Sequence, residues 1–248
     1  MQTMRTILVA LVLSAALSGP VAAGPWEDGA EAYARQDYAT VLRLWRPLAE
    51  AGHYTAQAFL GEIYETGKGV PQDYAEALKW YRKAADLGDS NAQANLGRLY
   101  QQGKGVRQDY AEALSWYRQA AGRENPTAQF YLGNMYHQGE GVRQDYTEAF
   151  RWFRKSADSG NASALYSLGL MYDRGEGVPQ NYVQAHMWYN LAAARFAASE
   201  ADGRAMAVNG RDAVAGRMTP AQIAEAQKLA SEWKPWFESW FEWMPRKP

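Results

Sequence analysis

A repeat of 36 residues constrains the fold of this chain more strongly than any other feature. One tryptophan and one glycine each recur four times at this interval, in the same order within every unit. The two sets are Trp80, Trp116, Trp152 and Trp188, and Gly67, Gly103, Gly139 and Gly175. A fixed period of this length indicates one supersecondary unit that buries its apolar faces against copies of itself.

Each unit reads as two helices joined by a turn. In the first complete unit, Leu60 and Ile63 fall on one apolar stripe at helical spacing. Gly67 follows this stripe, and we expect it to end the first helix in the left-handed conformation that glycine adopts at little cost. Asp73 and Glu76 then form a capping-box pattern at the start of the second helix. The second helix is expected to bury the repeated tryptophan.

A second glycine recurs within the first helix, where glycine costs about 1 kcal/mol relative to alanine. Its four positions are Gly61, Gly97, Gly133 and Gly169. We therefore expect the paired helix to pass too close at this point to leave room for a Cβ atom. Val70 is the only apolar residue of the turn that follows, and it is expected to fill the gap between the two helices.

The repeated motif A-x-x-x-L-G-x-x-Y-x-x-G-x-G-V-x-x-D-Y-x-x-A-x-x-W-Y-x-x-A-A resembles the Sel1-like repeat, a branch of the tetratricopeptide superfamily. The resemblance covers residues 30–194. It implies an all-α fold, an α/α solenoid superhelix of about five helix-turn-helix repeats with a C-terminal helical cap. Members of this family mostly act as adaptors, regulators or host-interaction proteins, so the resemblance implies a protein or peptide partner.

The first 23 residues have the pattern of a secretory signal peptide. Arg5 supplies a positive n-region, residues 7–17 an apolar segment, and Val21-Ala22-Ala23 a cleavage site of small residues. We expect cleavage after Ala23, a periplasmic or secreted protein, and no stable membrane insertion after cleavage. An uncleaved anchor is the alternative.

Three further segments follow. Residues 24–52 read as a degenerate N-terminal capping repeat, in which Pro47 is expected to kink or divide the second helix. Residues 53–198 carry the Sel1-like repeats, and residues 199–248 are expected to form C-terminal capping helices with an aromatic-rich tail. Within this cap, we expect an interruption of the helix around Asn209-Gly210 and a new helix start at Thr219, with Gln222 completing a capping box.

The tail from Trp233 to Met244 gathers aromatic side chains on one side of a helical wheel. The favoured interpretation is a helix that folds back on the solenoid as a cap. The alternatives are docking to a partner or to a membrane interface, although Glu238 and Glu242 on the polar side argue against anionic lipid. The residues that would dock are Trp236, Phe237, Trp240 and Phe241.

A binding surface is predicted on the concave face, which the first helices line in a tetratricopeptide-like superhelix. This face consists of the positions equivalent to 58, 62, 65 and 66. The first of them is Ala58 in the first complete unit and Ala94 in the next. These positions vary across the four units, whereas the core positions repeat. This contrast is typical of a groove that carries specificity on a constant frame. The candidate partner-binding residues are Glu62, Glu65, Arg98, Gln101, Phe130, Asn134, His137, Tyr166, Asp173 and Arg174.

No catalytic, cofactor or metal site is predicted. The chain has no cysteine, no G-x-S-x-G elbow and no H-E-x-x-H helix, and its three histidines, His53, His137 and His186, are far apart in sequence. Glu62 and Glu65 have the spacing of an acid/base pair, but carboxylates at this spacing usually form a solvated face.

Nucleic acid and cell-wall material are two further classes of ligand. The formal net charge of −1 gives no basic excess for nucleic acid. The alternative function is binding or hydrolysis of cell-wall material, peptidoglycan or β-lactam, and it rests on the family resemblance alone. Some bacterial members described as penicillin-binding or β-lactamase-like are cysteine-rich, so their disulfide-stapled form does not transfer to this chain.

Overall fold

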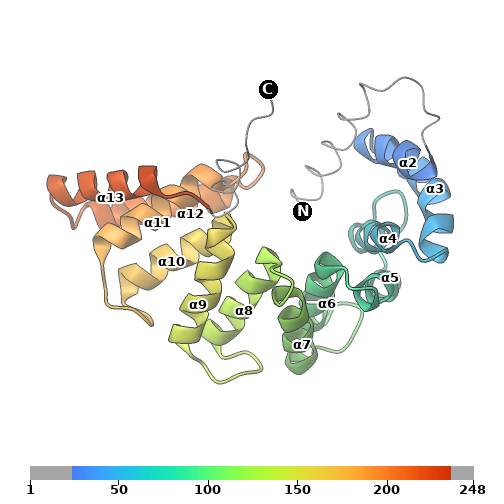
Figure 1. Ribbon diagram of the computed structural model, residues 1–248, viewed down its shortest axis with the longest axis horizontal. Coiled ribbons are helices and arrows are strands. Elements are labelled where there is room, and N and C mark those ends of the chain that lie inside the picture. The colour runs from blue at the N-terminus through green and yellow to red at the C-terminus, as the bar shows by residue number, and fades with distance from the viewer. Residues whose placement is uncertain (1–23, 236–248) are drawn as a thin grey trace, which may run out of the picture. The chain divides into compact units, whose positions relative to one another are not determined.

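The computed structural model describes residues 24–235, which form twelve α-helices and no β-strand (Figure 1). This confirms the predicted all-α class of consecutive helix pairs in contact. The signal-peptide prediction for residues 1–23 and the docking-tail prediction for residues 236–248 lie outside the described residues. The contacts divide the chain after Asp109 into two units, and each is described by itself.

The first unit holds five of these helices, each packed on the next along the chain. They are α2 (Pro25–Ala34), α3 (Tyr38–Glu50), α4 (Tyr54–Thr66), α5 (Tyr74–Asp86) and α6 (Ser90–Gln102). The indole of Trp45 is fully buried, stacks on Trp26 and packs against Phe59. An aromatic core therefore holds the first helix pair against the second.

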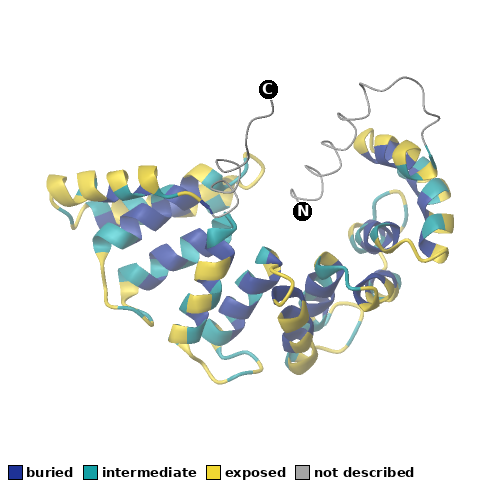
Figure 2. Ribbon diagram, viewed as in Figure 1, coloured by how far each residue is buried: buried dark blue, intermediate teal, exposed yellow. Residues whose placement is uncertain are grey.

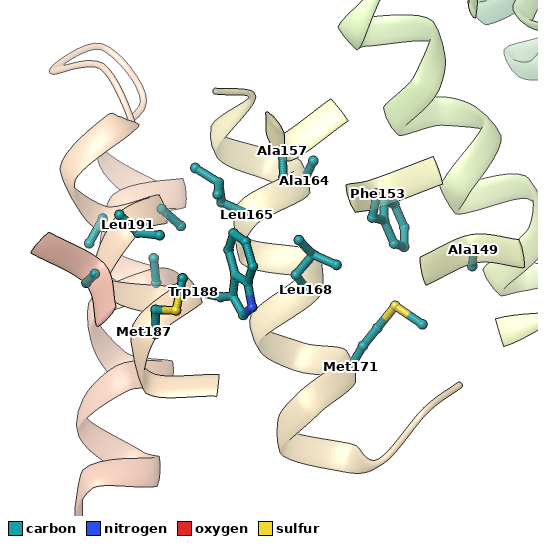
Figure 3. Packing of buried hydrophobic residues seen from close by; sticks show 14 residues of the cluster. Ala149, Phe153, Ala157, Ala164, Leu165, Leu168, Met171, Met187, Trp188 and Leu191 are labelled. Carbon is teal, nitrogen blue, oxygen red and sulfur yellow. The ribbon is translucent and has the colours of Figure 1, made fainter. Parts of the chain in front are cut away.

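The second unit holds the other seven helices. They are α7 (Tyr110–Ala121), α8 (Pro126–Gln138), α9 (Tyr146–Asp158), α10 (Ala162–Arg174), α11 (Tyr182–Arg195), α12 (Ala201–Ala215) and α13 (Pro220–Glu232). Figure 3 shows its core, where the indole of Trp188 lies beside Leu165 and Leu168. Both α12 and α13 pack on α11, so they cover the end of the last repeat as the sequence predicted.

Three of the four recurring helix glycines, Gly61, Gly133 and Gly169, lie against aromatic rings of the paired helix, which confirms the expected close approach at these positions. A Cβ atom on Gly61 would stand 2.5 Å from the ring of Tyr81, and one on Gly133 would stand 2.5 Å from the ring of Phe153. Gly29 has the same relationship to the indole of Trp45, at 2.1 Å. The degenerate first repeat therefore keeps the packing device although its sequence spacing differs.

The turn between the two helices also has the predicted conformation. Gly67 ends α4 with φ +68°, and Val70 packs partly buried against the core. Asp73 caps α5 by accepting from the backbone N–H groups of Ala75 and Glu76. The reciprocal half of the capping box was wrong, because the Glu76 carboxylate pairs with Lys79 instead.

Within residues 24–235, two predicted helix interruptions are not seen. Helix α3 continues through Pro47 as one helix, so the division was wrong, whereas the kink at Pro47 stays a prediction. Helix α12 continues through Asn209 and Gly210, and the absence of a side chain at Gly210 lets the Tyr189 ring approach to within 2.9 Å of where a Cβ would lie. The capping box at Thr219 is confirmed in both directions.

The repeated tryptophans differ in burial. Figure 2 colours the ribbon by burial, and buried and exposed residues alternate along the helices. Trp80, Trp116 and Trp188 belong to the buried core, with 3%, 9% and 1% of their surface exposed. Trp152 on α9 is only partly buried.

No helix within residues 24–235 is both long enough and apolar enough to span a membrane.

Candidate functional site

In the first unit, the predicted residue Glu62 forms a bridge between repeats. Its carboxylate accepts from the Tyr33 hydroxyl of α2 and from the Lys68 ammonium, each at 2.8 Å. The ammonium also lies 5.6 Å from the centre of the Tyr33 ring. Glu62 on α4 is therefore linked both to its own turn and to the first helix of the preceding repeat.

Glu65, one turn further along α4, forms a second bridge. Both carboxylate oxygens accept from Nη2 of Arg98 on α6, at 2.5 and 2.7 Å, and one of them accepts from the Tyr81 hydroxyl at 2.9 Å. Burial raises the pKa of Tyr81 well above its usual value, and the neighbouring Glu65 charge raises this pKa further. The tyrosine therefore stays protonated and acts as a donor. We call the side of the first helices that carries Glu62, Glu65 and Arg98, together with the equivalent positions of the other repeats, the first-helix face.

In the second unit, His137 of α8 contacts the turn after α10. Its Nε2 lies 2.8 Å from the carboxylate of Glu176, and Arg174 approaches the other oxygen at 3.7 Å. The imidazole also packs against the Tyr146 ring, with the ring centres 5.1 Å apart. The His137–Glu176 contact becomes an ion pair when the imidazole is protonated.

Asp173 of α10 reaches the segment that follows α12. Its carboxylate accepts from Arg217 at 3.3 Å, and the Arg217 guanidinium lies 5.5 Å from the centre of the Tyr182 ring. Asp173 also raises the pKa of the nearby Tyr189, although burial of that phenol is the larger cause. The cap is thus connected to the first-helix face of the last repeat.

Two polar groups on the first-helix face of the second unit have no protein partner. Phe130, Asn134 and His137 occupy one face of α8 at helical spacing, and Tyr166 begins the equivalent row on α10. Among residues 24–235, the Asn134 amide and the Tyr166 hydroxyl make no hydrogen bond, and both side chains are partly exposed. Burial raises the pKa of Tyr166, so its hydroxyl is a neutral donor.

The structure thus places the ten predicted site residues in two sets, one in each unit. Glu62, Glu65, Arg98 and Gln101 lie in the first unit, and the other six lie in the second. All are partly exposed except Arg174, which is exposed. Ala58 and Ala94, which began the predicted face, are instead 2% and 3% exposed. The buried stripe of α4 and of α6 is therefore wider than the sequence indicated, whereas the equivalent positions of α8 and α10, Phe130 and Tyr166, are partly exposed.

The sequence prediction missed the residues that hold this face in place. They are Tyr33, Lys68, Tyr81, Glu176 and Arg217. One signal was present: the variable residue of the G-x-G-V turn is Lys68 in the first complete repeat and Glu176 in the last. A charge at this turn position contacts the first-helix face in both units.

The acidic and imidazole side chains of the face are dispersed. Within residues 24–235, no three acidic or imidazole side chains come together as a metal site would require. Glu62 and Glu65 do not pair with each other, since each carboxylate accepts from a different tyrosine and a different cation. The face instead presents fixed hydrogen-bonding groups and aromatic rings.

Comparisons with known proteins agree with this architecture. The Sel1 repeat family matches residues 55–89, 90–125, 126–161 and 162–195, more than half of the chain. Among curated proteins, no sequence relative matches significantly.

Several solved structures are similar to the chain. A protective antigen present in uropathogenic Escherichia coli strains, described as displaying an SLR fold, shares 32% identity with a TM-score of 0.73 over 84% of this chain; the match spans 44% of the antigen's length. A Sel1 repeat protein from Oxalobacter formigenes shares 29% identity with a TM-score of 0.66, over 84% of this chain and 96% of its own. A protein from Klebsiella pneumoniae, described as a Sel1 repeat protein, shows the same fold at 22% identity, with a TM-score of 0.50 over 75% of this chain and 89% of its own.

Proposed function

Because the chain belongs to the Sel1 repeat family, we propose that it is a non-catalytic scaffold that binds a protein or peptide partner on its first-helix face. The observation that carries this proposal is the pair of unpartnered groups in the second unit, the Asn134 amide and the Tyr166 hydroxyl. An amide that both donates and accepts suits the backbone of an extended peptide. Phe130, on the same face of α8 as Asn134, offers an apolar contact.

Preorganisation supports the same role. Arg98, Glu65, Asp173 and His137 are held by contacts between elements, so these side chains lose little rotational freedom when a partner binds. The repeat frame supplies the rigid support, and the variable positions of the first helices supply the chemistry. A scaffold of this design discriminates partners by the groups on its face and needs no reactive residue.

The proposed place of action is the periplasm or the exterior of the cell. This part of the proposal rests on the residues before Gly24, whose sequence has the order of charged, apolar and small residues that signal peptidases recognise. Mass spectrometry of the exported protein should find Gly24 as its first residue. Retention of Met1 would contradict the cleavage.

Site-specific photocrosslinking tests the binding face directly. A photoreactive amino acid replaces Asn134 on α8, and a control replaces Arg151, an exposed residue of α9 whose side chain is 71% accessible. In cells, position 134 should give a discrete partner adduct that position 151 does not give. The same adducts at both positions, or none at position 134, would contradict the proposed face.

A parallel assay separates the scaffold from the cell-wall alternative. The purified protein is incubated with a chromogenic β-lactam and, separately, with sedimented peptidoglycan. We expect no turnover and no cosedimentation above a control protein. Turnover of the β-lactam would contradict the non-catalytic assignment.

A further inference from the structure

Trp152 departs from the pattern of the repeat. Its counterparts Trp80, Trp116 and Trp188 are buried, whereas Trp152 on α9 keeps part of its indole accessible. For Trp188, part of the cover comes from outside the repeats, because Trp233 packs edge-on against it with the ring centres 5.9 Å apart. The accessible side of Trp152 therefore marks a place where the described residues leave the repeated core incompletely covered.

This side of Trp152 borders a surface cleft of about 700 Å³ in the second unit. The cleft is lined by the end of α7 and the turn after it, which includes Glu124, by Gln129 of α8, by residues of α9, and by Trp233 and Lys234, which follow α13. Lys155 lies over the Trp152 indole, with its ammonium 4.5 Å from the ring centre, and it forms no ion pair among residues 24–235. Arg154 is already paired with Asp158 at 3.0 Å. The cleft thus combines indole surface with an available cation.

We propose that the C-terminal segment of the same chain, residues 236–248, binds in this cleft and covers Trp152. Five of the eight residues from 236 to 243 are Trp or Phe, and the other three include Glu238 and Glu242. Aromatic side chains match the indole surface, and the carboxylates match Lys155 in charge. Because Trp233 and Lys234 line the cleft themselves, the segment enters it directly and needs no linker.

The chain allows a clean crosslinking test because it contains no cysteine. Ser159 in the cleft and Ser239 in the segment are each replaced by cysteine in the full-length protein, and a short bismaleimide crosslinker is added. The control pairs Leu87→Cys with Ser239→Cys, since Leu87 occupies the position of Ser159 two repeats earlier at the end of α5. Peptide mapping after digestion reports the yield and the chains that are joined.

Binding of the segment in the cleft predicts a 159–239 crosslink within one chain at a much higher yield than the 87–239 control. Equal yields for both pairs would overturn the proposal. Crosslinks only between two chains would also overturn it, and would assign the cleft to the segment of a second copy.

Charge reversal gives an independent readout in the same background. Lys155→Glu should lower the 159–239 crosslinking yield by about twofold to fivefold, the effect of one exposed ion pair. Lys83→Glu is the matched control, because Lys83 covers Trp80 with its ammonium 4.4 Å from the ring centre, as Lys155 covers Trp152. Thermal unfolding of each variant confirms folding. An unchanged yield with Lys155→Glu in a folded protein would refute the role of this cation.

Discussion

Nη2 of Arg98 donates to both carboxylate oxygens of Glu65 and so joins α6 to the first helix of the preceding repeat. Both side chains are largely buried, with 18% and 13% of their surface accessible. Glu65 is also the acceptor of the buried Tyr81 hydroxyl. The contact therefore stabilises the stacking of two repeats while it fixes polar groups on the face proposed to bind a partner.

Loss of this bridge should destabilise the first unit. Arg98→Met leaves a mostly buried carboxylate with one donor fewer, and we expect the free energy of unfolding to fall by about 1–3 kcal/mol. Chemical denaturation followed by circular dichroism measures this change. Lys79→Met, which breaks the more exposed Lys79–Glu76 pair, should cost only about 0–1 kcal/mol. Equal costs for both variants would show that the bridge has no special role.

The helix glycines give a prediction that opposes helix propensity. Gly133→Ala improves the propensity of α8 by about 1 kcal/mol, yet its Cβ would stand 2.5 Å from the Phe153 ring. We expect a net destabilisation of about 1–3 kcal/mol from this overpacking.

Gly216→Ala is the control for this substitution. Gly216 has φ −61°, and its Cβ would meet no atom closer than 3.5 Å. The free energy of unfolding of the Gly216→Ala variant should be unchanged or raised by up to about 1 kcal/mol. Stabilisation of the protein by Gly133→Ala would contradict the packing described for this glycine.

The repeated tryptophan of the last repeat should be critical for folding. Trp188 is 1% exposed and packs between α10, α9 and Trp233, so Trp188→Ala should cost about 3–5 kcal/mol. The midpoint of thermal unfolding, followed by the helical circular dichroism signal, checks this value. An unchanged midpoint would mean that the indole contributes nothing to the core.

The stability of the second unit should depend on pH through His186 of α11. Burial lowers the pKa of this imidazole below its usual 6.5, the charge of Arg211 lowers it further, and Asp212 opposes the shift. The unfolded chain therefore binds the proton more readily than the folded one. The contribution of the neutral imidazole is fully present above pH 6.5 and is lost as the pH falls through the lowered pKa.

Thermal unfolding at about pH 7.5 and about pH 5.5 measures this dependence. When the pH is lowered from the first value to the second, the unfolding midpoint of the wild-type protein should fall further than that of the His186→Gln variant. This variant keeps the other two histidines. An equal fall in both proteins would assign the pH dependence to other groups.

The sequence predicted the features that repeat and are local. Gly67, Asp73 and the helix glycines act within one helix pair, and their recurrence made their roles readable. Two of the wrong predictions depend on contacts between distant residues. The Tyr189 ring packs on Gly210 within a continuous α12, and the wide burial that includes Ala58 reflects packing on a second neighbour.

The partners of the candidate site were harder to predict for the same reason. Lys68 contacts Tyr33 from 35 residues away, and His137 contacts Glu176 from 39 residues away. Neither spacing equals the repeat period, so pattern matching between units does not pair these residues. Only the stacking of one repeat on the next brings them together.

The most direct test of the proposed function is the affinity of the crosslinked partner for purified variants. Asn134→Ala combined with Tyr166→Phe removes the two unpartnered polar groups of the first-helix face, and Arg151→Ala on α9 serves as the control. We predict that the dissociation constant of the double variant rises by about tenfold or more, as expected for two central contacts, with an unchanged unfolding midpoint and an unaffected control. Unchanged affinity of the folded double variant would contradict the account.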